Sequence, residues 1–182
     1  MKKALIGGLI GGFILFIWQF LSWTVLDIHG SKFSYTPAEN QILQTFNNSN
    51  LEEGDYFLPG VPPGTSAEAE QKLYMDNIGK PWATISYHKS MSNNMGLNML
   101  RAFVIDFLSA FLLCFILLGN RALNFKIVFI SCIVVGLIGF MTIPYLNSIW
   151  FQSNSIPDLI DAVVQWGLVG AFLGWLLPEK KK

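Results

Sequence analysis

Three polar side chains lie inside otherwise apolar stretches, namely the carboxylate of Asp106, which could relay a proton, and the amides of Gln19 and Gln165, which could donate hydrogen bonds to it. An ionised carboxylate in hydrocarbon costs about 2.5 to 3.5 kcal/mol on insertion scales, so Asp106 is expected to face a polar partner or a water-filled pocket. Each side chain lies about seven residues, roughly 10 Å of helical rise, from the outer end of its stretch. We therefore expect one buried polar layer, in which Gln19 or Gln165 bonds Asp106.

Two charged residues are expected to extend this layer. Asp161 lies one helical turn before Gln165 on the same face, and Arg101 lies at the mouth of the stretch that contains Asp106. Arg101 and Asp106 are five residues apart, about 140° around a helix, so they are poor partners for each other. Arg101 is therefore predicted to lie nearer Asp161, on another helix.

The layer has two interpretations. It could be a proton or ion relay, or it could consist of structural hydrogen bonds that fix helix register, worth about 0.6 kcal/mol each on average. Transporters usually carry more buried ionisable residues and broken helices in repeated halves, which favours the structural interpretation. Trp18 and Trp166, beside the two glutamines, could also line a pocket for a lipid or quinone headgroup.

One set of residues has metal-ligating types at helical spacing, namely His88, Met91, Met95 and Met99. Thioethers with an imidazole suit Cu(I). The residues between Met91 and Leu97 discourage a helix, and methionine stripes are more often packing surface, so no metal site is expected and copper handling is the weaker alternative. His29 is expected simply to lie in the headgroup region.

The composition is that of a membrane protein. Of 182 residues, 52% are hydrophobic, 14% are aromatic and only 13% are charged, against about 25% charged in soluble domains. A formal net charge of zero gives no basic patch, so no nucleic-acid partner is expected. Cys114 and Cys132 lie in apolar stretches and suggest neither a disulfide nor a zinc site. No P-loop, HExxH, CxxC or nucleophile elbow is present, so neither an enzyme nor a cofactor is expected.

Four apolar stretches, at 4–26, 98–118, 127–146 and 157–177, are long enough to cross a bilayer. The first lacks a cleavage site and is interpreted as a retained anchor. The third is expected to end beside Pro144. Lysine and arginine gather at both termini and in the link 119–126, which predicts cytoplasmic N- and C-termini, with the polar segment 27–97 outside. The expected fold is an all-α membrane protein, a four-helix bundle in a bacterial inner membrane.

The segment 27–97 carries eight acidic and four basic residues, a net charge of about −4. Capping patterns at Thr36 and Thr65 predict helices to about Phe46 and Asn77. Residues 55–58 and 82–87 are expected to be extended. This segment should form a small, mostly helical extracytoplasmic cap, and it has too few large apolar residues to be stable without support from other surfaces.

Three sequence segments resemble a family of bacterial inner-membrane proteins of the same length: the first apolar stretch with FIWQFLSW, the polar segment with LPGVPPGT and GKPWATISYHK, and the second apolar stretch with NMLRAFVIDFLSAFLLC. The likeness covers most of the chain. It implies four spans and a large first outer loop, and it brings no activity or site residues.

The expected function is that of a non-catalytic accessory or assembly subunit of a larger inner-membrane complex, such as a respiratory or secretory one. Small residues let helices approach closely, and they recur at Gly7, Gly8, Gly11 and Gly12 and again at Gly170 and Gly174. Membrane lipids and other integral membrane subunits are the expected partners. The alternative is a small transporter, or a lipid- or quinone-handling protein, that uses a polar pocket around Asp106.

Overall fold

The computed structural model describes residues 1–120 and 122–178. Four basic residues behind the orientation argument, Arg121 and Lys180 to Lys182, lie outside this range. The chain is mostly helical and divides into two compact units. Unit 1 comprises residues 1–34 and 94–182, and unit 2 comprises Tyr35–Asn93.

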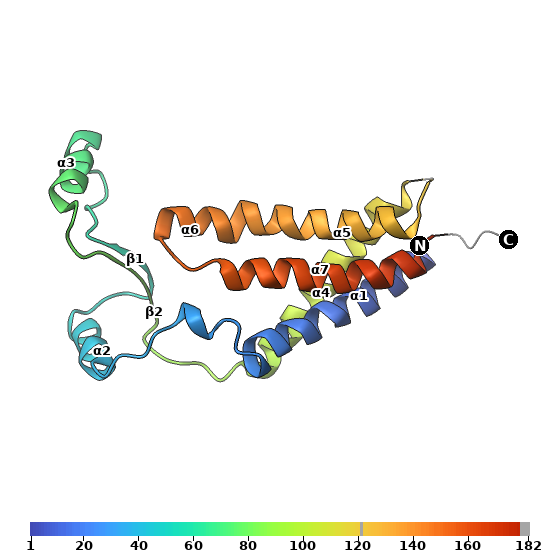
Figure 1. Ribbon diagram of the computed structural model, residues 1–182. Helices are drawn as coiled ribbons and strands as arrows, with labels where there is room; N and C mark the ends of the chain where they lie inside the picture. The colour runs from blue at the N-terminus through green and yellow to red at the C-terminus, as the bar shows by residue number, and fades with distance from the viewer. Residues whose placement is uncertain (121, 179–182) are drawn as a thin grey trace. The chain divides into compact units, whose positions relative to one another are not determined.

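Unit 1 contains four helical runs that are long and apolar enough to cross a membrane, as the sequence predicts. The first is α1 (Lys2–Phe20) with the π-helix η1 (Leu21–Val25), and the second is α4 (Met95–Leu118). The third joins α5 (Phe125–Phe140), the π-helix η3 (Met141–Tyr145) and α6 (Leu146–Phe151). The fourth is α7 (Ile156–Leu176), which runs beside α5 (Figure 1).

Helix α1 packs against α4 and against α7, and α5 packs against α7. Glycines make these contacts close. A Cβ at Gly12 would lie 2.6 Å from the backbone N and Cα of Phe107 on α4, and one at Gly136 would lie 2.6 Å from the carbonyl oxygen of Ala162 on α7. The predicted small-residue faces are therefore used inside unit 1. Gly139 is different, because a Cβ there meets no atom within 4 Å.

The third helical run does not end at Pro144, contrary to the sequence-based expectation. It continues through η3 and α6 to Phe151. Proline has no N–H to donate, and a π turn inside a helix is one of the arrangements that absorbs such an interruption. The run ends instead at Gln152, whose φ of 50° places it in the left-handed region. The loop between α6 and α7 is therefore shorter than a run that ends at Pro144 would leave.

Unit 2 consists of α2 (Glu39–Asn48), β1 (Gly54–Leu58), α3 (Ala67–Asn77) and β2 (Ala83–Tyr87). The strands pair antiparallel, with Tyr56 opposite Ile85. Two helices and one strand pair match the sequence prediction, but α2 begins at Glu39 with Ala38, and not Thr36, at its N-cap position. Helix α3 is capped by Ser66, which accepts a hydrogen bond from the N–H of Ala69, rather than by Thr65.

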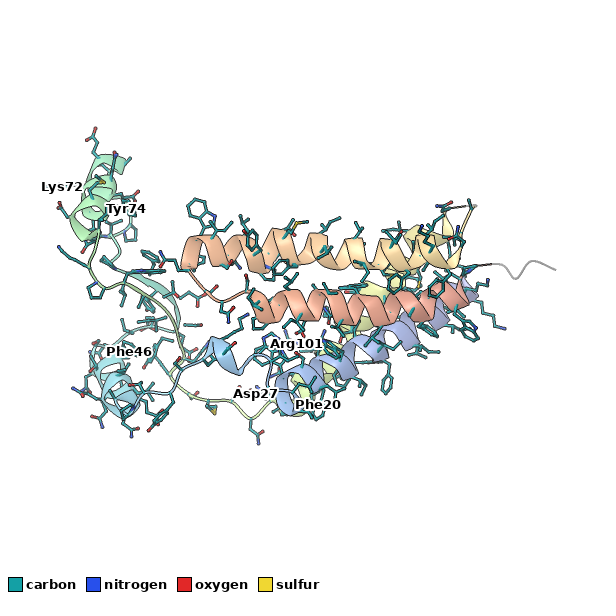
Figure 2. All side chains as sticks on the ribbon, in the orientation of Figure 1. Phe20, Asp27, Phe46, Lys72, Tyr74 and Arg101 are labelled. Carbon is teal, nitrogen blue, oxygen red and sulfur yellow. The ribbon has the colours of Figure 1, made fainter. Side chains whose placement is uncertain are left out.

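Unit 2 has almost no core. Within residues 35–93, all of which the structure describes, Tyr87 is the only buried residue. Tyr74 on α3 is 72% exposed (Figure 2). At one end of the strand pair, Lys89 Nζ lies 2.9 Å from Glu52 Oε2. This hydrogen bond raises the pKa of Lys89 above its ordinary value. Such surface pairs contribute little to stability, so this contact does not replace a core.

Candidate functional site

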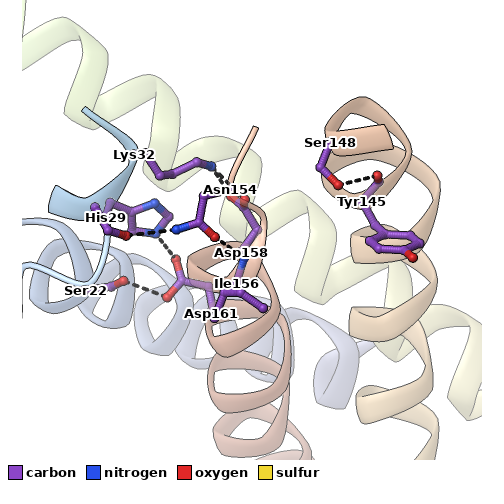
Figure 3. Close-up of polar contacts among 10 residues, drawn as sticks. Ser22, His29, Lys32, Tyr145, Ser148, Asn154, Ile156, Asp158 and Asp161 are labelled. Atoms are coloured by element: carbon purple, nitrogen blue, oxygen red, sulfur yellow. Dashed lines mark hydrogen bonds and ion pairs between the residues drawn. The ribbon is translucent and has the colours of Figure 1, made fainter. Parts of the chain in front are cut away.

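The most connected polar cluster in unit 1 is centred on the buried carboxylate of Asp161. Its Oδ1 accepts hydrogen bonds from Trp18 Nε1, at 2.9 Å, and from Ser22 Oγ, at 2.6 Å. Its Oδ2 lies 2.8 Å from His29 Nε2. Figure 3 shows the imidazole and the serine hydroxyl meeting the two oxygens of this carboxylate. Ser22, His29 and Asp161 are all buried.

Local backbone features bring His29 to this position. After η1 the chain turns at Asp27, whose φ is 48°, and then forms the short 3-10 helix η2 (Gly30–Lys32). Gly30 leaves room at this turn for the Asp27 carboxylate, because a Cβ there would lie 2.5 Å from Asp27 Oδ1. The imidazole of His29 then stacks on Trp23, with ring centroids 4.0 Å apart and planes 6° apart.

An ion pair lies beside the Asp161 cluster. Lys32 Nζ is 2.7 Å from Asp158 Oδ2, and both side chains are partly exposed (Figure 3). His29 and Lys32 are three residues apart, as are Asp158 and Asp161. Two parallel contacts therefore fasten the segment after α1 to the first turns of α7. We call residues 27–33 with these two contacts the clasp.

Asp106 belongs to a separate contact. Gln19 Nε2 donates a 2.9 Å hydrogen bond to Asp106 Oδ1, which joins α1 to α4. Oδ2 of Asp106 is buried without a hydrogen-bond partner among the described residues, and so is Oε1 of Gln165. The expected layer is thus divided into an α1–α4 pair and an α1–α7 cluster. Gln165 is in neither.

The structure differs from the expectation for Arg101. Its side chain is exposed on α4 (Figure 2) rather than buried in a polar layer. Its expected partner, Asp161, instead bonds residues of α1 and of the clasp. The physical reason is helix order, because Asp161 on α7 bonds side chains of α1 and the clasp, while α4, which carries Arg101, packs mainly against α1.

The helix needed to align the methionine stripe is not formed. Helix α4 begins at Met95, so Met95 and Met99 lie on a helix that His88 and Met91 do not share. Met91 is fully exposed. Among the described residues, no group of three or more His, Cys, Asp or Glu side chains could hold a metal ion.

A shallow cavity of about 240 Å³ lies between α1 and α4. Its wall is mostly apolar and includes Gln19, which bonds Asp106. The remaining lining residues are Phe16, Phe20, Asn98, Met99 and Ala102. This cavity places one amide beside apolar side chains.

Sequence reasoning missed the roles of Ser22, His29 and Lys32. Two signals could have indicated them. Trp18 and Ser22 are four residues apart and so share a helix face. The three-residue spacing of His29 and Lys32 equals that of two aspartates at the start of α7. Neither signal shows that the chain turns back after η1, so the contact itself could not be derived.

Comparison with family models, with curated proteins and with solved structures finds no match to this chain.

Proposed function

We propose that this protein is a non-catalytic accessory or assembly subunit of a larger complex in a bacterial inner membrane. In this proposal the N- and C-termini are cytoplasmic and unit 2 lies on the opposite side. Its partners are membrane lipids and other integral membrane subunits.

The observation that carries the proposal is the missing core of unit 2. Folded segments are stabilised mainly by burial of apolar surface, at about 25 cal/mol per Å². In unit 2 the large apolar side chains are instead exposed, for example Tyr74 at 72%, Met75 at 59% and Ile78 at 62%. Exposed apolar patches on polar segments usually mark interaction sites. A partner that covers α3 and the strand pair would supply the missing burial.

Co-purification tests this proposal. The full chain, extracted in mild detergent, is expected to comigrate with other membrane subunits on native electrophoresis, and mass spectrometry identifies them. Replacing Tyr74 and Ile78 together with serine should abolish comigration. Replacing the neighbouring Lys72 with serine is the matched control and should preserve it. A lone species near 20.4 kDa for the wild-type chain would contradict the proposal.

A small transporter, or a lipid- or quinone-handling protein, is the second candidate. It is favoured by the cavity beside Gln19 and by the buried Oδ2 of Asp106, which has no hydrogen-bond partner among the described residues. This candidate expects a measurable flux or ligand binding from the isolated protein in liposomes. Asp106→Asn should abolish that flux if the carboxylate relays a proton, whereas a structural role leaves the variant folded and associated with its partners.

The proposed orientation has its own test. Epitope tags at the two termini should be protected from outside intact spheroplasts, and a tag inserted near Gly64 should be accessible. Accessibility of a C-terminal tag from outside would overturn the orientation.

A further inference from the structure

The contacts of Asp161 determine which imidazole nitrogen carries hydrogen. The indole N–H of Trp18 can only donate, and the Ser22 hydroxyl also lies within hydrogen-bond distance of the same oxygen. An ionised carboxylate has no hydrogen to donate, so it can only accept hydrogen bonds. The remaining oxygen of Asp161 lies 2.8 Å from His29 Nε2, and with Asp161 ionised this nitrogen must be the donor. The free nitrogen of the imidazole is then Nδ1.

His29 Nδ1 is buried. The residue is 3% exposed, and Nδ1 has no hydrogen-bond partner among the described residues. Trp23 covers one face of the ring. Of the other charged groups nearby, Asp158 is held by Lys32, and Asp27, on the clasp itself, is exposed. Among the described residues, α1 and η1 contribute only uncharged side chains to the cluster, namely those of Trp18, Ser22 and Trp23.

We propose that His29 and Asp161 form a proton-binding dyad, in which the lone pair of His29 Nδ1 takes up one proton. The new N–H bond converts the imidazole to imidazolium, which remains paired with the carboxylate. The charge of the cluster changes from −1 to 0. A buried net charge is unfavourable in a low-dielectric site, so proton uptake is stabilised by neutralisation of the cluster. This site goes beyond a docking role, which requires no proton.

The chain has two histidines, so His88→Gln leaves His29 as the only one. Full-length His88→Gln protein, labelled with ¹⁵N-histidine and placed in lipid nanodiscs, is followed by NMR from pH 8 to pH 5. At the alkaline end we expect the tautomer with hydrogen on Nε2 and a bare Nδ1. On acidification a second N–H should form at Nδ1. A neutral form with hydrogen on Nδ1, or no imidazolium by pH 5, would overturn the dyad.

Two aspartate variants complete the test. Asp161→Asn removes the opposing charge and should lower the ratio of imidazolium to imidazole at a given pH about tenfold or more. Asp158→Asn, the matched control, breaks only the Lys32 contact and should leave the ratio within about twofold. Equal effects of the two variants would also overturn the proposal. If Asp161→Asn fails to fold, the tautomer in the His88→Gln protein decides by itself.

Discussion

At the scale of single residues, Gly12 marks a close approach of α1 to the backbone of α4. Gly12→Ala would place a methyl group against the backbone of Phe107 and push α1 from α4. We expect a loss of about 1 to 3 kcal/mol in the free energy of unfolding, typical of overpacking. Unfolding in mixed micelles measures it. Gly139→Ala, which adds a methyl group in open space, is the control and should cause no loss.

Asp106 gives a second prediction at this scale. Asp106→Asn keeps an acceptor oxygen for Gln19 and removes the charge, whereas Asp106→Leu leaves the Gln19 amide without its acceptor. The asparagine variant should therefore stay within about 1 kcal/mol of wild type. The leucine variant should lose more, because a buried donor without a partner costs about 1 to 3 kcal/mol. The free energies of unfolding in detergent compare the two, and equal losses would contradict the bonding role of Gln19.

The sequence predicted the contacts of some single residues and not of others. The depth of Gln19 and Asp106 within regular helices can be counted, and the two side chains do bond. His29 lies beyond the end of a helix, where position depends on a left-handed residue and a 3-10 turn. Neither follows from periodicity. Arg101 was misplaced because helix depth says nothing about which helices are neighbours.

At the scale of elements, charge reversals in the clasp test whether Lys32 and Asp158 attract each other. Lys32→Asp should lower the free energy of unfolding by up to about 1 kcal/mol, since the pair is partly exposed. Adding Asp158→Lys should recover only part of the loss. The reason is that lysine is less favourable than aspartate in the first turn of a helix. No recovery at all would mean that the contact is not electrostatic.

Hydrogen exchange tests the extension of the third helical run. Amides of α6, residues 146–151, should exchange slowly, because they belong to a continuous helix past Pro144. Residues 152–155 should exchange fast. Uniform fast exchange from Pro144 onward would instead match the loop expected from sequence. That expectation treated proline as a helix end and did not allow for a π turn.

At the scale of the whole molecule, the lack of a core predicts that unit 2 does not fold alone. A peptide of residues 35–93 should show a poorly dispersed NMR spectrum and no cooperative thermal transition, because Tyr87 alone is buried. The same residues within the intact protein are the comparison. A sharp, well-dispersed spectrum from the peptide would contradict the docking argument.

The helices of both units were largely predictable, since length, apolar content and capping residues are local properties. The order in which the helices pack was not. It depends on which glycine faces meet, and three helices offer such faces. The sequence therefore predicts how many helices can cross a membrane better than it predicts which of these helices are neighbours.

The contact between Lys3 and the end of α7 has a consequence for chain connectivity. Lys3 Nζ donates to the carbonyl oxygen of Leu177 at 2.8 Å, so the first turn of α1 meets the last turn of α7. The start of the first helix and the end of the last helix of unit 1 therefore lie side by side. A short linker could join residues 178 and 1 while the chain is opened between Gly119 and Asn124, giving a circular permutant that begins at α5 and keeps every helix contact.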